Sequence, residues 1–261
     1  MMSTQAKVAL VTGATSGIGL ACTQTLAQQG FAVFVVARSG ENVSSVVKQL
    51  REDGYEAAGA VGDVASTDSV KEAVAQAVQT YGRIDVLVNN AGTSGGGEIH
   101  KLQESLWLNV VNTNLNSVFR VTQEVLVQGG MLERGWGRII SIASTGGKQG
   151  VIYASPYSAS KHGVVGFTKA VGLELAKTGV TVNAVCPGYV ETPMAVKVRQ
   201  GYAVHWGVTE EIVQDKFDAK IPLGRYSTPE EVAGLVGYLT TDTAASITAQ
   251  AINVCGGLGN Y

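Results

Sequence analysis

Tyr157 and Lys161 are the residues whose types and spacing point most directly to chemistry. Side chains four residues apart on a helix share one face. A tyrosine hydroxyl has an ordinary pKa of about 10, and a neighbouring ammonium lowers that pKa because it favours the phenolate. Such a tyrosine can give its proton to a developing alkoxide near neutral pH. On spacing alone, the same pair is also typical of an ordinary helix face.

Ser144 supplies a second polar group for the same reaction. It comes just after an apolar run over 138–142 that predicts a strand. There its hydroxyl could hydrogen-bond the carbonyl oxygen that the tyrosine protonates, which would make a small electrophilic site for a ketone. A site of this kind needs a hydride donor beside it, and the surrounding strands and helices must position all three groups.

Strands and helices alternate along the chain. Short runs that are apolar throughout, separated by glycine-punctuated turns, predict a parallel sheet that helices cover on both faces. Strands are expected over 8–11, 31–36, 57–61, 84–88, 138–142, 180–185 and 251–254, and helices over 18–29, 41–53, 67–81, 102–128, 157–177 and 230–239.

Residues 189–226 interrupt this alternation with two short helical patches. An insertion near the end of a strand lies over the carboxyl edge of the sheet, where ligands bind in this architecture. We therefore expect a substrate lid, although its aromatic residues Tyr202 and Trp206 could equally pack on the sheet. No linker or repeat divides the 261 residues. The prediction is a single α/β domain over 1–261, a Rossmann-type doubly wound parallel sheet with a helical lid insertion.

The segment Thr12–Gly19 joins the first strand to the first helix. Its glycines permit a tight turn and a close approach of the backbone to a pyrophosphate, and the helix N-terminus then faces that anion. The alternative is a mere turn, but the strand before it and the helix after it favour a nucleotide site. The residues that we expect to contact the cofactor here are Thr12, Gly13, Thr15, Ser16, Gly17, Ile18 and Gly19.

Arg38 indicates which dinucleotide binds. An acidic residue after the second strand would bind the ribose hydroxyls of NAD, whereas an arginine accommodates the extra phosphate of NADP. Ala37–Ser39 holds no acid, so we predict NADP(H). Asp63 and Val64 could touch the adenine, or Asp63 could cap the following helix. Asn89–Gly92 forms a small-residue turn past which the cofactor can run, with contacts from Asn90, Ala91 and Gly92.

The composition excludes several other functions. Hydrophobic residues make up 45% of the chain, charged residues 15%, and the net charge is −2, so neither disorder nor nucleic-acid binding is expected. The polar start, Met1–Lys7, does not resemble a signal peptide, and no apolar run is long enough to span a membrane. Cys22, Cys186 and Cys255 are too scattered for a metal site or a disulfide framework. We expect buried, reduced cysteines in a cytoplasmic protein without a metal.

Taken together, these motifs identify the chain as similar to the classical short-chain dehydrogenase/reductase family from end to end. The matching pieces are Thr12–Gly19, Asn89–Gly92, Asn114, Ser144, Tyr157 with Lys161, and Asn183 with Pro187-Gly188. The resemblance implies that Tyr157 is the acid, Ser144 polarises the carbonyl, and Lys161 also holds the nicotinamide ribose. It implies that Asn114 supports a water chain that resupplies the proton through Lys161, and that Pro187, Gly188, Val190 and Thr192 flank the nicotinamide.

A narrower resemblance is to the ketoreductases of bacterial aromatic (type II) polyketide synthases, the actinorhodin-type enzymes. It is carried by Ser144–Gly150, by Glu191–Met194, by the tail Cys255–Tyr261 and by Met131–Gly135. It implies a homotetramer that uses NADPH to reduce one ketone, usually at the ninth carbon, of a poly-β-ketone carried on an acyl carrier protein. The alternatives are a 3-oxoacyl reductase of fatty-acid synthesis or another small-ketone reductase, and, more remotely, a non-catalytic NADP sensor.

One loop departs from that narrower pattern. The ketoreductases have a proline before two glycines, whereas this chain reads Thr93-Ser94-Gly95-Gly96-Gly97, and serine lacks the fixed φ of proline. The position and configuration of the alcohol therefore stay open. The residues that we expect around the substrate are Ser94, Gly95, Gly96, Ser144, Val151, Tyr202 and Trp206. Carrier proteins are acidic, so Arg38, Lys148 and His162 are the candidate docking cations.

Overall fold

The computed structural model describes residues 6–259 and residue 261. Most of the polar start, 1–5, and Asn260 of the tail motif lie outside the described residues. Seven parallel strands form one sheet in the order β3-β2-β1-β4-β5-β6-β7. The order reverses between β1 and β4, which is where a ligand crevice forms in such sheets. The strands are β1 Val8–Thr12, β2 Ala32–Ala37, β3 Ala57–Val61, β4 Val86–Asn89, β5 Gly137–Ile142, β6 Val180–Pro187 and β7 Ala251–Val254.

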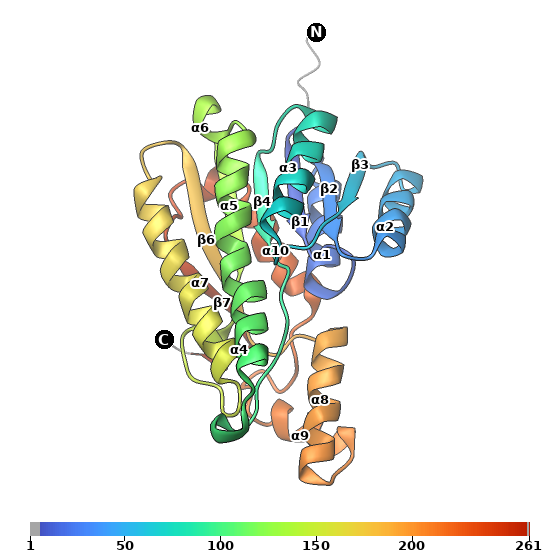
Figure 1. The fold of residues 1–261 in the computed structure, drawn as a ribbon, viewed down its shortest axis with the longest axis vertical. Coiled ribbons are helices and arrows are strands. Elements are labelled where there is room, and N and C mark those ends of the chain that lie inside the picture. The colour runs from blue at the N-terminus through green and yellow to red at the C-terminus, as the bar shows by residue number, and fades with distance from the viewer. Residues whose placement is uncertain (1–5, 260) are drawn as a thin grey trace.

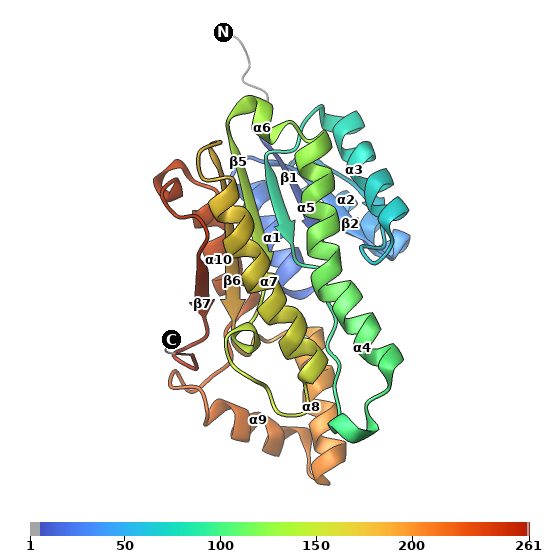
Figure 2. The same ribbon diagram turned by 60° about the vertical axis from the view of Figure 1, so that its left-hand side comes forward.

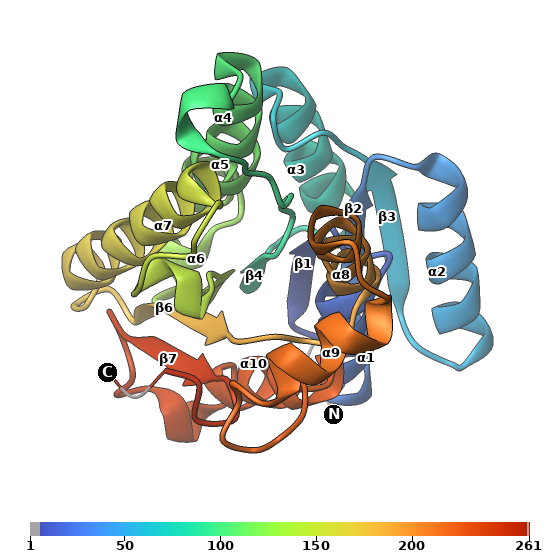
Figure 3. The same cartoon turned by 90° about the horizontal axis from the view of Figure 1, so that it is seen from below.

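Helices cover both faces of this sheet (Figures 1 and 3). One layer holds α1 (Gly17–Gln28), α2 (Gly40–Glu52) and α10 (Pro229–Leu239). The other holds α3 (Thr67–Tyr81), α4 (Glu104–Val111), α5 (Ser117–Gln128) and α7 (Ser155–Glu174). A short helix, α6 (Met131–Arg134), leads into β5. The predicted doubly wound α/β fold is thus confirmed, and β3, α3 and β7 have the predicted bounds.

The interior explains why these strands read as uninterrupted apolar runs. Every residue of β1 is buried, because helices press on the sheet from both sides. Alternate residues of the strand enter different clusters: Ala9 and Val11 pack toward α1 and α10, whereas Val8 and Leu10 pack toward α3 and α5. Two cores therefore hold the carboxyl ends of the strands at fixed positions, which is the edge where the site must lie.

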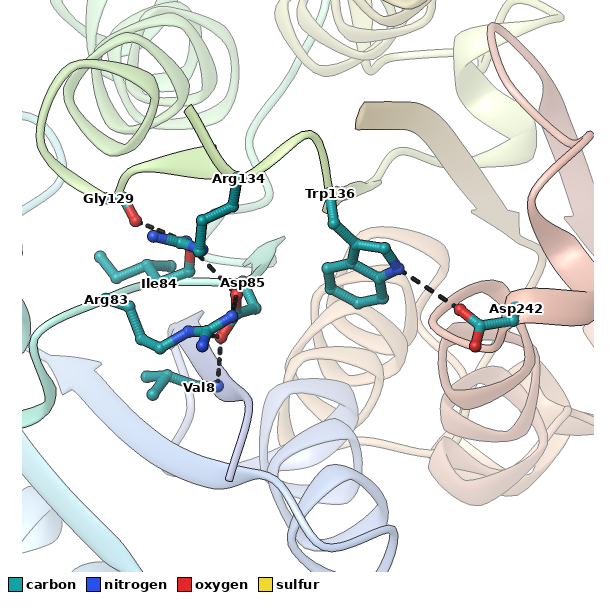
Figure 4. A network of polar contacts seen from close by, with 8 residues as sticks. All are labelled: Val8, Arg83, Ile84, Asp85, Gly129, Arg134, Trp136 and Asp242. Atoms are coloured by element: carbon teal, nitrogen blue, oxygen red, sulfur yellow. Dashed lines mark hydrogen bonds and ion pairs between the residues drawn. The ribbon is translucent and has the colours of Figure 1, made fainter. Parts of the chain in front are cut away.

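The opposite edge of the sheet is tied together by a buried carboxylate (Figure 4). Asp85, fully buried just before β4, accepts a hydrogen bond of 2.9 Å from the amide of Val8. Arg83 binds the same carboxylate through two nitrogens, and Arg134 lies 3.3 Å from it. Arg134 also donates to the carbonyl oxygens of Ile84 and Gly129. A buried charge needs such partners, so this network serves the sheet rather than the chemistry.

Two expectations about the helices need correction. The predicted helix over 102–128 begins at Glu104 and contains a π-helical turn over Asn112–Asn116, which rotates Asn114 inward. The first of the two patches in the insertion is a helix of 14 residues, α8 (Pro193–Trp206), and it is followed by α9 (Glu210–Asp218). Both lie beyond the carboxyl edge of the sheet, at the bottom of the molecule (Figure 2). We call residues 189–226 the lid.

Candidate functional site

The glycine-rich loop has the backbone that a pyrophosphate needs. Gly13 and Gly17 have positive φ values of 62° and 52°, which glycine adopts without strain. A β-carbon at Gly19 would overlap with the carbonyl oxygen of Gly13 and with the side-chain amide nitrogen of Asn90. Helix α1 begins at Gly17, with the extended Ser16 as its N-cap. The three glycines therefore leave no side-chain bulk where the anion of a dinucleotide would lie, and the first turn of α1 faces that place.

Thr12 and Asn90 connect this loop to the end of β4. The buried hydroxyl of Thr12 accepts hydrogen bonds from the amides of Asn90 (3.0 Å) and Ala91 (3.1 Å). The side chain of Asn90 donates in return to the carbonyl oxygens of Thr12 and Gly13, both at 3.0 Å. Thr12 and Asn90, both predicted to contact the cofactor, thus use their polar side-chain groups to connect the glycine-rich loop to the turn after β4.

Arg38 follows β2 at the same edge and is exposed. Its guanidinium is available to a phosphate at the start of α2, where Ser39 caps the helix. Asp63 does not cap α3, so that alternative is wrong. Ser66 is the N-cap of that helix, and the Asp63 carboxylate accepts instead from the amide of Ala65 at 2.9 Å. Asp63 therefore shapes the turn that follows β3.

The predicted catalytic side chains meet at Gly146. A β-carbon there would lie 3.3 Å from Oγ of Ser144, 3.4 Å from the ring of Tyr157 and 3.0 Å from Val151. The Gly146 amide donates to Ser144 Oγ at 3.0 Å, because Ser144 caps the short turn Thr145–Gly147. The turn after β5, the loop that follows it and the first turn of α7 thus place a hydroxyl, an apolar side chain and a phenol next to one another.

Burial decides the pKa values of this pair. The sequence predicts that Lys161 lowers the pKa of Tyr157, but burial raises it, and a hydrogen bond with Ser144 opposes that rise. Burial also lowers the pKa of Lys161 to about 8. Lys161 is 6% exposed, and its ammonium donates to the carbonyl oxygen of Ile142 at 2.7 Å. It lies 5.8 Å from the centre of the Tyr157 ring. A raised pKa keeps the phenol protonated at neutral pH, which is the state that a proton donor needs.

Asn114 holds the loop over the site. Its side chain accepts from the amide of Thr93 at 2.8 Å and donates to the carbonyl oxygen of Thr93 at 2.9 Å. It also donates to Oγ of Ser160 at 3.2 Å, one residue before Lys161. A β-carbon at Gly92 would lie 3.3 Å from Asn114 and 3.8 Å from the Lys161 ammonium, so the two predicted residues flank the same turn.

The loop over 93–97 rests on Tyr153, a residue that the sequence analysis missed. The Gly97 amide donates to the carbonyl oxygen of Tyr153 at 2.7 Å, and a β-carbon at Gly96 would overlap with that oxygen. Tyr153 has a φ of 60°, which is uncommon for a residue with a side chain. Ser94 is exposed at the tip of the loop, and Gly95 packs against Val110. Nothing in the residue type of Tyr153 signals this conformation.

Residues 187–193 pass from β6 over the glycine-rich loop. Gly188 lies against Cys255: a β-carbon at position 188 would come within 2.9 Å of the β-carbon of Cys255. Val190 is buried, and Thr192 packs its methyl group 3.1 Å from the position of a β-carbon at Gly17. Thr192 is also the N-cap of α8. The structure therefore brings Pro187, Gly188, Val190 and Thr192 to the edge where the glycine-rich loop lies.

The lid residues Tyr202 and Trp206 pack on each other, with ring centres 5.0 Å apart, and both contact Phe217 of α9. Trp206 is still 37% exposed.

The three cysteines are free and buried, as expected. In the described part of the chain no cluster of metal-binding side chains occurs, and none of its helices is long and apolar enough to cross a bilayer.

Lys148 is not a free docking cation, which corrects that expectation. Its ammonium donates to the carbonyl oxygen of Ala251 (2.6 Å) and to Asn253 (2.8 Å), both in β7. The ring of Tyr261, the C-terminal residue, lies 5.8 Å away, and its hydroxyl donates to the carbonyl oxygen of Thr145. The tail motif and Lys148 therefore brace the turn that follows Ser144. His162 and Arg38 are exposed.

Comparison with known proteins agrees with this geometry. The family model for short chain dehydrogenases matches residues 7–203. The chain is 66% identical, over the whole of both chains, to the ketoacyl reductase of the monensin polyketide synthase of Streptomyces virginiae. It is 60% identical to a ketoacyl reductase of Streptomyces coelicolor, again over both whole chains.

The fold has an equally close match. The crystal structure of an actinorhodin polyketide ketoreductase variant with NADPH superposes with a TM-score of 0.96 at 60% identity, and the match covers the whole of both chains. The site residues, the sheet order and the extent of these matches lead to one conclusion. The chain belongs to the short-chain dehydrogenase family.

Proposed function

We propose that this protein is an NADPH-dependent ketoreductase of a type II polyketide synthase. Its substrate would be a poly-β-ketone on an acyl carrier protein, and one ketone, at the ninth carbon, would become a secondary alcohol. The observation that carries the proposal is the convergence of Ser144, Tyr157 and Val151 on Gly146, at the edge that holds the glycine-rich loop. The relatives at 66% and 60% identity, whose names describe polyketide and ketoacyl reductases, support the substrate class.

Ser144 and Tyr157 would have separate roles in the reduction. When NADPH is bound, it supplies a hydride to the carbonyl carbon. Ser144 already accepts from the Gly146 amide, so its hydroxyl can donate a hydrogen bond to the ketone oxygen and polarise the carbonyl without losing its proton. Tyr157 gives its proton to that oxygen as the alkoxide forms, and a buried, neutral phenol is suited to this step. The carbon gains a hydride and the oxygen a proton, which completes the alcohol.

Lys161 and Asn114 would support this step without touching the ketone. The Lys161 ammonium uses one proton on Ile142 and has others for the nicotinamide ribose. Asn114 fixes Thr93 beside Gly92. It would thereby hold the turn Asn89–Gly92, past which the cofactor runs, and the loop over 93–97 in fixed positions relative to each other. Arg38 would bind the phosphate that distinguishes NADP from NAD. In this proposal the whole chain works as one catalytic domain, in the cytoplasm, where buried cysteines stay reduced.

The first experiment follows NADPH oxidation with trans-1-decalone, a bicyclic ketone that resembles a cyclised intermediate, beside an acetoacetyl thioester. Turnover of the bicyclic ketone with NADPH, and little with NADH or the thioester, is the expected result. The reverse preference would assign the protein to fatty-acid or small-ketone metabolism. A Tyr157→Phe variant should still bind NADPH but lose turnover by about a hundredfold or more, whereas a non-catalytic sensor would show no turnover to lose.

A homotetramer belongs to the same proposal. Leu108 of α4 and Phe119 and Val127 of α5 are exposed apolar residues, and the last two lie on one helix face. A second copy of the chain would cover them. Light scattering should give a tetramer for the wild type and smaller species for Val127→Asp. The control is Val204→Asp, which adds the same charge to an exposed valine of the lid.

Docking of the carrier protein would use Arg38 and His162, the two exposed basic residues that remain from the predicted three. At saturating NADPH, which separates docking from the proposed role of Arg38 in cofactor binding, Arg38→Glu should raise the KM for a carrier-bound ketone more than the KM for free trans-1-decalone. Equal effects on both substrates would argue against docking at Arg38.

A further inference from the structure

The lid is a self-contained unit on a narrow base. At the base, the Ser227 amide donates to the carbonyl oxygen of Tyr189 at 2.9 Å, and the Glu191 amide donates to that of Ser227 at 3.0 Å. Tyr189 stacks on Phe217, with ring centres 4.9 Å apart, and on Tyr226 at 5.2 Å. The lid thus has its own aromatic core, and the chain enters and leaves it side by side.

Arg199 is the charged residue at the centre of this unit. It lies in α8, is 7% exposed, and binds both oxygens of Glu191 at 2.8 and 2.9 Å. Its Nε donates to Glu210, at the start of α9, at 3.0 Å. The guanidinium lies 5.3 Å from the centre of the Tyr226 ring. One side chain therefore joins both lid helices to the base, with the two-pronged geometry that lysine cannot supply.

Glu191 connects this clamp to the cofactor edge. Its neighbour Thr192 packs on Gly17 of the glycine-rich loop, and Val190 on its other side is buried. In an extended segment, successive side chains point to opposite sides. Thr192 thus faces the loop that would hold the pyrophosphate, while Glu191 faces Arg199. A shift of Thr192 would therefore also move the Glu191 carboxylate, because the two residues are adjacent in the chain.

We propose that Arg199 is a positioning residue that couples the cofactor to the lid through Glu191. Binding of NADP at Thr192 fixes Glu191, and the Arg199 clamp then sets α8, with Tyr202 and Trp206, over the ketone. This inference rests on the proposed function for the place of the cofactor beside Thr192. Arg199 contacts neither reactant. It acts by orienting the side chains that do, and a misplacement of about 1 Å can cost about a hundredfold in rate.

The test uses Trp206 as a reporter on the lid. The chain has three tryptophans, so a Trp107→Phe/Trp136→Phe background leaves the emission of Trp206 alone. NADP+ should change that emission. In Arg199→Met the change should be lost, although the Kd for NADP+ stays within about threefold of the background. At saturating NADPH, the KM for trans-1-decalone should rise by about tenfold, which corresponds to about 1.4 kcal/mol.

Arg225→Met is the matched control. Arg225 makes a similar two-pronged pair with Glu231, at 2.7 and 3.0 Å, but this pair is exposed and joins the end of the lid to α10. Its loss should leave the emission change and the KM for the ketone unaltered. If Arg199→Met matched Arg225→Met in both measurements, Arg199 would not couple the two sites.

The proposal can still be tested if Arg199→Met does not fold or if the wild type does not turn over the ketone. If Arg199→Met does not fold, Arg199→Lys keeps a charge in the lid without the two-pronged grip on Glu191, and it should lose the emission change all the same. An unchanged response in Arg199→Lys would overturn the proposal. If the wild type does not turn over the ketone, the proposed function fails, but the response of Trp206 to NADP+ still decides whether Arg199 couples cofactor and lid.

Discussion

The carbonyl oxygen of Tyr153 accepts a hydrogen bond of 2.7 Å from the amide of Gly97. This contact joins the loop that precedes the catalytic helix to the loop that departs from the ketoreductase pattern. Tyr153 holds an unfavourable φ of 60°, and its ring contacts His205 of the lid, with ring centres 5.9 Å apart. Backbone strain that persists at such a junction is a sign of a constrained site. The loop over 93–97 and the lid therefore meet at Tyr153.

Gly96→Ala should disturb this junction. The new methyl group would overlap with the Tyr153 carbonyl oxygen, so the loop must move away from Tyr153. A movement of about 1 Å can lower kcat/KM by about a hundredfold, and we expect the ratio of the two alcohol enantiomers to change as well. Steady-state kinetics and chiral chromatography of the product measure both effects. The control is Ser94→Ala, at the exposed tip of the same loop; if it did as much damage, the contact with Tyr153 would not be the cause.

Much of this arrangement can be predicted from the sequence, because it depends on local patterns. Thr67–Tyr81 has helical spacing between a serine cap and a glycine, and both of its bounds were predicted. Ser144, Tyr157 and Lys161 could be assigned because the order of strands and helices brings the turn after β5 to the start of α7. The single buried site that they form follows from parallel topology, in which all strands end at one edge.

The misplaced residues are those whose partners are distant in sequence. Lys148 looked like a docking cation, but its ammonium binds Ala251, which lies 103 residues further along the chain. Arg199 carries no signal in the sequence, yet it is buried against two carboxylates. No spacing rule reveals such pairs. The pKa of Tyr157 was misjudged for a related reason, since burial, which depends on the whole fold, outweighs the neighbouring ammonium.

Arg38→Ala should change the choice of cofactor. A charged hydrogen bond contributes about 1.5–3 kcal/mol, so the KM for NADPH should rise by about tenfold or more, while the KM for NADH should stay nearly constant. Initial rates with each cofactor at saturating ketone measure this. Lys48→Ala removes an exposed cation further along α2, paired with Glu52, and should have no effect. An equal rise for NADPH and NADH would mean that Arg38 does not bind the distinguishing phosphate.

Lys148→Met should weaken the fold rather than docking. It removes two hydrogen bonds between the turn after Ser144 and β7, so the free energy of unfolding should fall by about 2 kcal/mol. Urea denaturation measures this change, and Lys177→Met, at an exposed lysine, is the comparison. The KM values for carrier-bound and free ketone should change by the same factor. A rise confined to the carrier-bound substrate, with unchanged stability, would restore Lys148 as a docking residue.

The pKa of Lys161 predicts a pH-dependent stability. Burial lowers this pKa from 10.5 to about 8. Between these values the unfolded chain binds more protons than the folded chain, so the contribution of Lys161 to the free energy of unfolding rises with pH. Below pH 8 the buried ammonium costs about 3 kcal/mol, and the cost disappears as the pH approaches the unfolded pKa.

Lys161→Met has no such cost. Part of its advantage is offset by loss of the hydrogen bond to Ile142, but that loss does not create the predicted slope. The unfolding free energy of Lys161→Met minus that of the wild type should therefore decrease between about pH 7 and pH 10, by up to about 3 kcal/mol. Urea denaturation at several pH values measures it. Lys169→Met changes an exposed lysine of the same helix and should show no slope. A flat difference for Lys161→Met as well would mean that Lys161 keeps its ordinary pKa in the folded protein.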